Sequence, residues 1–155
     1  MKTNLPSHDL MRPYEVQLHY KRPIFSSMKS ISNAKDANTI LKQFINLNQI
    51  DVKEFFWVIF LTRANRILGI STIGCGNASG VIVNIKEIFQ LTLSTNASQI
   101  IVAHNHPSGK LIPSENDKHI TQKLKEGLLL FDAQLLDHLI ITSESFLSFA
   151  DQGIL

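Results

Sequence analysis

The sequence has one cysteine, no long apolar run and no marked excess of charge of either sign. Cys75 has no second cysteine for an internal disulfide, and no secretory leader pattern opens the chain. We therefore expect a reducing, cytoplasmic setting, with Cys75 buried and inert rather than nucleophilic. The longest apolar runs, 55–61 and 127–131, are far shorter than the roughly 20 residues of a spanning helix. No membrane segment is expected.

The charge balance argues against a dedicated nucleic-acid binder. Fifteen Lys and Arg residues stand against 13 Asp and Glu residues, a net charge of +2 at pH 7. Nucleic acid is therefore possible as a partner but is not indicated by charge. The 155 residues, of which 44% are hydrophobic, suffice for one domain with an ordinary core.

Apolar periodicity predicts an α/β fold with a single mixed β-sheet flanked by helices. A tail is expected at 1–13, and period-two alternation predicts a first strand at 14–20. Helical spacing predicts three helices, at 32–47, 85–93 and 114–131. Apolar and β-branched runs predict five further strands, at 55–61, 67–73, 99–104, 135–142 and 146–149. We divide the chain into an N-terminal tail with the first strand, 1–25, and a domain, 26–155.

Two histidines and one aspartate are candidate metal ligands. His104 and His106 stand two residues apart at the end of an apolar strand, where such positions share a face. Asp117 falls in the first turn of the helix beginning near Ser114, close to both histidines if the loop 107–113 folds back. Catalytic zinc takes three such ligands and keeps a fourth position open. Each residue also has an ordinary explanation, a solvated histidine or a helix cap, and spacing alone barely favours the metal site.

The same residues resemble a known motif. His104-x-His106-Pro107, followed after the loop by Ser114-x-x-Asp117, looks like the JAMM motif of the JAB/MPN metalloprotease superfamily. The strings at 104–109, 113–114 and 136–138 are similar to the RadC branch of that superfamily. The resemblance covers residues 31–155 and implies a JAB/MPN, cytidine-deaminase-like architecture for the domain at 26–155.

The resemblance implies a His-x-His-x10-Asp zinc site and assigns roles to its residues. It implies one zinc ion per chain with His104, His106 and Asp117 as ligands. Ser114 would donate a hydrogen bond to the tetrahedral intermediate.

An upstream glutamate would act as the general base through the water at the zinc. Glu54 is favoured because it precedes the apolar strand at 55–61, where the family's glutamate stands. Glu87 is the rival, although a capping box with Asn84 already explains it.

The function that follows is a zinc-dependent, metallopeptidase-like hydrolase that cleaves an amide bond in a protein or peptide. Its substrate and oligomeric state stay open. One alternative is a non-catalytic MPN scaffold that binds a partner. Another is a DNA-repair-associated protein acting on or near nucleic acid, as the RadC name and the His-Asn-His string prompt.

Three further residues refine this interpretation. Asn105 stands where the JAMM deubiquitinases carry Ser or Thr, so isopeptidase activity on ubiquitin is not carried over. His138 is interpreted as a satisfied strand histidine in preference to a contact behind the metal ligands. His119 is left out of the site because it lies two residues beyond Asp117, a poor spacing for sharing a helix face.

Overall fold

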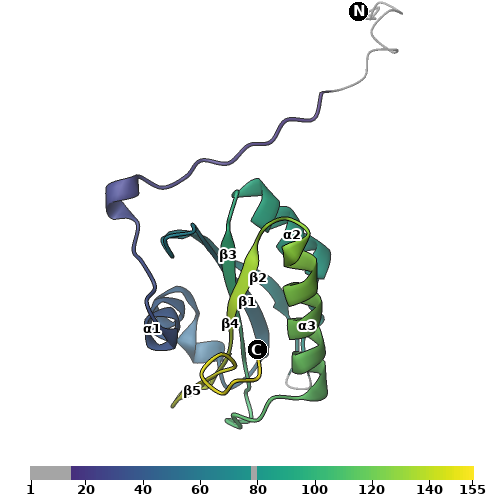
Figure 1. Cartoon of the computed structure of the whole chain (residues 1–155). Coiled ribbons are helices and arrows are strands. Elements are labelled where there is room, and N and C mark those ends of the chain that lie inside the picture. Colours follow the sequence, from purple (N-terminus) through teal and green to yellow (C-terminus); the bar gives the residue numbers. More distant parts are fainter. Residues whose placement is uncertain (1–14, 78–79) are drawn as a thin grey trace, which may run out of the picture.

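A five-stranded sheet forms the centre of the molecule in the computed structural model, which describes residues 15–77 and 80–155 (Figure 1). The strands are β1 (Phe55–Leu61), β2 (Ile67–Cys75), β3 (Gln99–Asn105), β4 (Gln134–Ile141) and β5 (Phe146–Ser148). The helices are α1 (Ala34–Phe44), α2 (Ile85–Ser94) and α3 (Glu115–Leu129), with short 3-10 helices η2 (Phe25–Ser27) and η3 (Leu47–Gln49). The tail predicted at 1–13 lies outside the described residues.

The strand order is β2-β1-β3-β4-β5. β3 and β4 run parallel, joined through α3, while the other neighbouring pairs are antiparallel. The predicted mixed sheet flanked by helices is therefore confirmed.

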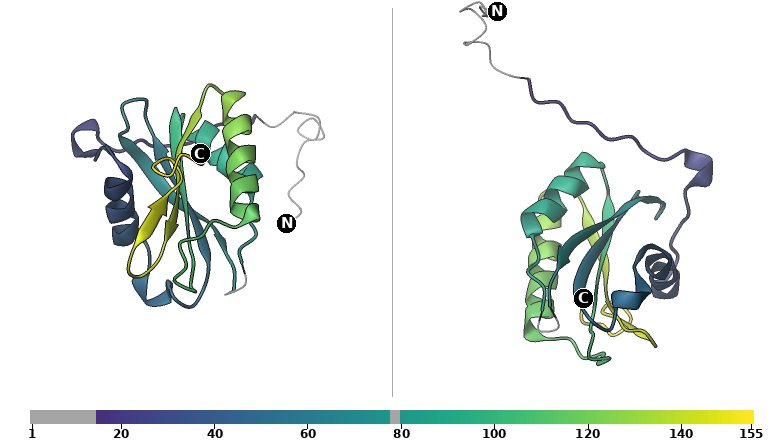
Figure 2. Two further views of the ribbon diagram at one scale, coloured as in Figure 1. Left: turned by 60° about the horizontal axis from the view of Figure 1, so that its bottom comes forward. Right: turned by 180° about the vertical axis from the view of Figure 1, so that it is seen from behind.

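Helices cover both faces of this sheet. α1 lies on one face, whereas α2 and α3 lie on the other, as the front and back views agree (Figures 1 and 2). β1 lies between two strands, and its side chains alternate between the two apolar cores. Phe56, Val58 and Phe60 pack toward α2 and α3, and Trp57, Ile59 and Leu61 pack on the α1 side. This burial on both faces explains why the strand is apolar at every position.

The crossover from β3 through α3 to β4 brings three chain segments to one end of the sheet. The carboxyl end of β3 and the amino end of α3 meet there, as in other parallel β-α-β units. β1 runs antiparallel to β3, with Phe56 opposite His104, so the amino end of β1 reaches the same edge. Residues from all three segments can therefore contribute to one site.

The strand predicted at 14–20 is wrong for its described residues, 15–20, which pair with no other strand. Val16 is 96% exposed and Leu18 is 73% exposed. Residues 29–31 pair instead beside the start of β2, through the bridge between Ser30 and Arg66. Alternation alone does not make a strand, because a strand also needs backbone pairing with a neighbour.

The prediction that Cys75 is buried is also wrong, because this residue is exposed at the end of the edge strand β2. The other predicted helices and strands are confirmed within a few residues of their expected ends. The Asn33 side chain caps α1. Among the described residues, no helix has the length and apolar character required to cross a bilayer. The division of the chain at residue 25 stays a prediction.

Candidate metal centre

Two imidazoles and one carboxylate converge where β3 ends and α3 begins. His104 Nε2 lies 3.0 Å from His106 Nε2 and 3.2 Å from Asp117 Oδ1. His106 Nε2 lies 3.7 Å from Asp117 Oδ2. One ligand atom from each residue falls within 4.8 Å of the others, and His104 and Asp117 are buried. The structure thus brings together the three residues that the sequence singled out.

The proton positions on the rings suit a cation between them. His106 Nδ1 lies 2.7 Å from the Lys110 carbonyl oxygen, which can only accept, so Nδ1 carries the proton. His106 Nε2 of the neutral ring therefore presents a lone pair toward His104 Nε2 and Asp117. His104 turns its Nδ1 away from the group, to 2.8 Å from His138 Nε2. Nitrogen and carboxylate donors that face one another at this spacing fit zinc or a similar ion.

Asp117 has a structural role and a candidate ligand role at the same time. Its backbone N–H donates to Ser114 Oγ, and its Oδ2 accepts from the Ser114 backbone N–H at 2.7 Å, which completes a capping box. The cap fixes the carboxylate and leaves Oδ1 facing His104. The two explanations considered for this residue are therefore compatible.

The histidines and the carboxylate of this group shift one another's pKa values. Burial raises the pKa of Asp117, but His104 and His106 outweigh burial and hold the pKa well below its ordinary value. The Asp117 carboxylate raises the pKa of the His106 imidazole. The Asp117 carboxylate thus stays charged at the place where a cation fits.

Glu54 faces the same group from the amino end of β1. The β1–β3 register pairs Phe56 with His104, so Glu54 lies on the same face and edge as His106. A hollow of about 390 Å³ is lined by Glu54, His106 and Ser114, together with the loop 107–113. Glu54 is half-buried, and burial raises the pKa of its carboxyl group against the opposing effect of the two histidines. A carboxylate so placed is suited to accept a proton from water.

Glu87, the rival to Glu54, is engaged elsewhere. It lies in the first turn of α2, where its backbone N–H donates to Asn84 Oδ1 and its carboxylate accepts from Asn84 Nδ2. It does not line the hollow beside His106. This placement favours Glu54, whose role as general base stays a prediction.

Asn105 is a positioning residue that the sequence did not reveal. Its buried side chain points away from the ligand atoms and bonds three backbone groups that flank Glu54. Nδ2 donates to the carbonyls of Ile50 at 2.6 Å and Lys53 at 2.7 Å, and Oδ1 accepts from Phe55 N–H at 2.7 Å. All three partners are 50 or more residues away along the chain, so only the fold reveals this clamp.

The interpretation of His138 as a strand histidine with no link to the site is wrong. Its Nε2 lies 2.8 Å from His104 Nδ1, and its ring is completely buried. Burial lowers the pKa of His138 well below its ordinary value, so the ring is neutral. His119, which the sequence left out, is exposed on α3.

The fold and this site together define an α/β domain that can hold a metal ion on a buried His-His-Asp group. The family model described as "RadC-like JAB domain" matches residues 31–154. The chain therefore belongs to the RadC-like JAB domain family, as its motifs predicted.

Relatives from several bacteria agree with this family. A UPF0758 protein of Flavobacterium johnsoniae is 41% identical over 127 residues, which are 82% of this chain and 54% of the relative. One of Coxiella burnetii is 35% identical over 91% of this chain and 62% of the relative. The UPF0758 protein YfjY of Escherichia coli is 39% identical over 66% of this chain and 64% of the relative. The chain thus matches just over half to about two thirds of the length of each.

Proposed function

We propose that this chain is a zinc-dependent hydrolase of the metallopeptidase type, which cleaves an amide bond in a protein or peptide. The observation that carries the proposal is that Glu54 and His106 line one hollow, while His106 also lies in one group with His104 and Asp117. Amide hydrolysis at a metal site requires residues that bind the metal, a residue that accepts a proton, and access from solvent. A cytoplasmic location, expected from the single cysteine, belongs to the same proposal.

His104, His106 and Asp117 are the residues that would hold zinc, one ion per chain. The chemistry that zinc supplies when bound is Lewis acidity, which polarises a carbonyl group and makes water a stronger acid. His106 must be neutral to act as a ligand, and its Nδ1–H bond to the Lys110 carbonyl keeps Nε2 free for that purpose.

Glu54 and Ser114 act on the substrate side of the hollow. Glu54 accepts a proton from the attacking water and returns it to the leaving amine. The raised pKa of Glu54 makes both transfers easier near neutral pH, because the protonated carboxyl group is then a usable acid.

Ser114 Oγ already accepts a bond from the Asp117 backbone N–H, which leaves its own hydroxyl proton to be donated. That proton is available to the oxyanion that develops on the substrate carbonyl.

The two alternative functions have less support. A scaffold that only binds a partner has no need for three converging ligand residues beside a half-buried glutamate. The DNA-repair-associated alternative was prompted in part by the His-Asn-His string. The Asn105 side chain, however, is fully occupied by the backbone at 50–55, so this string does not present three side chains to one site.

Proteome-wide cleavage profiling with added zinc tests the proposal. Wild type and Glu87→Gln should generate the same set of new protein termini, whereas Glu54→Gln should generate none and still bind one equivalent of zinc. Cleavage lost in Glu87→Gln and kept in Glu54→Gln would reassign the base. Zinc-loaded wild type that yields no termini beyond those of Glu54→Gln contradicts the peptidase proposal.

Ser114→Ala separates the catalytic from the structural role of this hydroxyl. We expect slower turnover with zinc retained, and a stability loss of about 1 kcal/mol because the helix cap is lost. Loss of zinc from this variant would assign Ser114 a structural role alone.

A further inference from the structure

A chain of buried polar groups extends from the candidate metal centre into the domain. It starts at His104 Nδ1, which lies 2.8 Å from His138 Nε2. The other ring nitrogen, His138 Nδ1, lies 2.6 Å from Thr121 Oγ1. Thr121 Oγ1 in turn lies 2.6 Å from the backbone carbonyl oxygen of Asp117. This series of hydrogen bonds thus begins at one candidate ligand, His104, and ends at the backbone of another, Asp117.

The hydrogen bond from Thr121 to the Asp117 carbonyl determines which atom is the donor in each of the other hydrogen bonds. The Asp117 carbonyl oxygen can only accept, so the single hydroxyl proton of Thr121 is donated to it. Thr121 Oγ1 must then accept from His138, and His138 Nδ1 carries the proton. His138 Nε2 is left with a lone pair, so His104 Nδ1 must be the donor between the two rings.

We infer that His138 and Thr121 are positioning residues that hold His104 in the tautomer able to bind the metal. With its proton on Nδ1, His104 presents the lone pair of Nε2 toward His106 and Asp117. The opposite tautomer would place a proton on Nε2, at the position of the ion. This inference rests on the proposed function, because the residue that His138 and Thr121 orient, His104, is a ligand of the proposed zinc site.

Two aromatic rings pack against the His138 ring. The ring stacks on Phe149 with centroids 4.5 Å apart, and its edge meets Phe56 at 5.8 Å. Phe149 is held in turn by its backbone N–H, which donates to the His138 carbonyl at 3.0 Å. The ring is completely buried, so water does not replace either of its hydrogen-bond partners.

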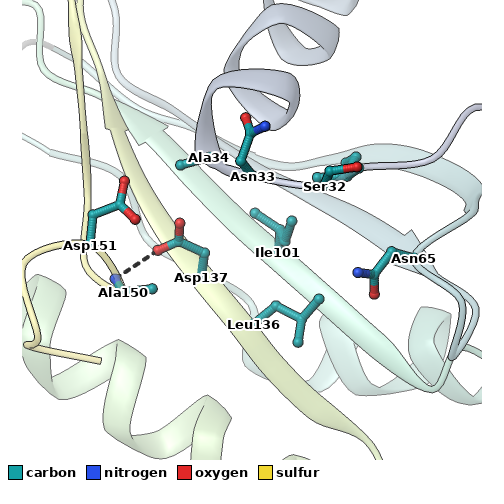
Figure 3. A pocket seen from close by; sticks show the side chains of 10 residues that line it. Ser32, Asn33, Ala34, Asn65, Ile101, Leu136, Asp137, Ala150 and Asp151 are labelled. Carbon is teal, nitrogen blue, oxygen red and sulfur yellow. Dashed lines mark hydrogen bonds between the residues drawn. The ribbon is translucent and has the colours of Figure 1, made fainter.

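Asp137 holds this packing in place from the opposite face of the sheet. Its carboxylate accepts from Ser148 Oγ at 2.6 Å and from the Ala150 backbone N–H at 3.0 Å. Figure 3 shows the bond to Ala150 in a second hollow, on the α1 side of the sheet, which Asp137 and Ala150 both line. The two bonded residues stand on either side of Phe149 in the sequence. Asp137 therefore ties the segment that covers His138 to β4.

Thr121 offers a matched pair of variants. Thr121→Val keeps the shape of the side chain and removes the hydroxyl, whereas Thr121→Ser keeps the hydroxyl. In Thr121→Val, His138 Nδ1 loses its acceptor. The proton then moves to Nε2, where it is donated to His104 Nδ1, and His104 takes the wrong tautomer for the metal.

Nitrogen-15 NMR of the metal-free protein at alkaline pH reads the tautomers directly. Wild type and Thr121→Ser should carry protons on Nδ1 of both His104 and His138, and Thr121→Val should carry them on Nε2. Competition with a zinc chelator should show zinc affinity lowered by about 10- to 100-fold in Thr121→Val and restored in Thr121→Ser. A purely structural role of Thr121 would lower stability and leave the tautomers unchanged.

Two results would overturn the inference: an Nε2 proton on His138 of wild type, or unchanged tautomers and zinc affinity in Thr121→Val. Neither measurement depends on catalysis. If wild type cleaves no substrate while the tautomers respond as described, the proposed hydrolase fails and the positioning role stands. If cleavage occurs and Thr121→Val binds zinc like wild type, the positioning role fails alone.

Discussion

Replacing Asn105 with alanine should destabilise the domain strongly, although the side chain is not a metal ligand. The change removes all three bonds that this side chain makes to Ile50, Lys53 and Phe55. Each bond contributes about 1 kcal/mol net. A carbonyl left buried without a partner adds about 1 to 3 kcal/mol, and Ile50 is a buried residue. We therefore expect a loss of roughly 4 to 6 kcal/mol, a large share of the roughly 5 to 15 kcal/mol of an ordinary domain.

Urea unfolding of the metal-free protein, with a chelator present, measures this loss without a contribution from bound ion. Asn116→Ala is the matched control, because Asn116 is exposed in the first turn of α3 and should change stability by less than about 0.5 kcal/mol. Hydrogen exchange should accelerate at the backbone amides of residues 51–56 in the Asn105 variant, because the clamp on that segment is gone.

Asn105→Asp distinguishes lost hydrogen bonds from lost volume. Aspartate has the same shape, but it turns an oxygen toward the two carbonyls that now accept from Nδ2 at 2.6 and 2.7 Å. It should destabilise the domain at least as much as alanine does. A cost below about 1 kcal/mol for either variant would be too small for three buried bonds and would refute the clamp.

Two further predictions concern pH and the core. Without metal, the free energy of unfolding should fall as the pH rises above about 6.5, the ordinary value for histidine. The raised pKa of His106 contributes stability that is complete below that value and is lost as the pH passes through the folded pKa. Urea titrations at several pH values should show this fall reduced in His106→Gln, and an equal fall in both proteins would contradict it. In the core, Leu124→Ala should cost about 2 to 5 kcal/mol because Leu124 is completely buried. Leu130→Ala, at a side chain that is 82% exposed, should change stability by less than about 0.5 kcal/mol in the same assay.

The elements that the sequence predicted well are those encoded locally. Apolar runs and helical spacing predicted nearly every element, because side-chain period and burial follow from the same backbone geometry. The candidate ligands were also found from local pattern, since a strand end and a helix start both carry recognisable residues. Residues 15–20 show the limit of such patterns: their alternation is that of a strand, but no edge of the sheet pairs with them.

The parts that the sequence missed depend on pairing between distant segments. His138 contacts His104 because β4 lies parallel to β3 in one particular register, which includes an irregularity between Ile100 and Ile101. Asn105 reaches the segment before β1 through the antiparallel register of β1 and β3. Register is set by the whole sheet, and a shift of one residue turns every side chain to the other face. Asn105 and His138 therefore became interpretable only in the folded molecule.

Zinc-edge anomalous diffraction from crystals of the zinc-loaded protein tests the central claim most directly. One anomalous peak per chain should lie about 2.0 to 2.2 Å from the ligand atoms of His104, His106 and Asp117, with Glu54 facing it across the hollow. The peak should be absent from crystals of Asp117→Ala. A peak bound elsewhere, or none at this group in the wild-type protein, would contradict the assignment of a metal centre.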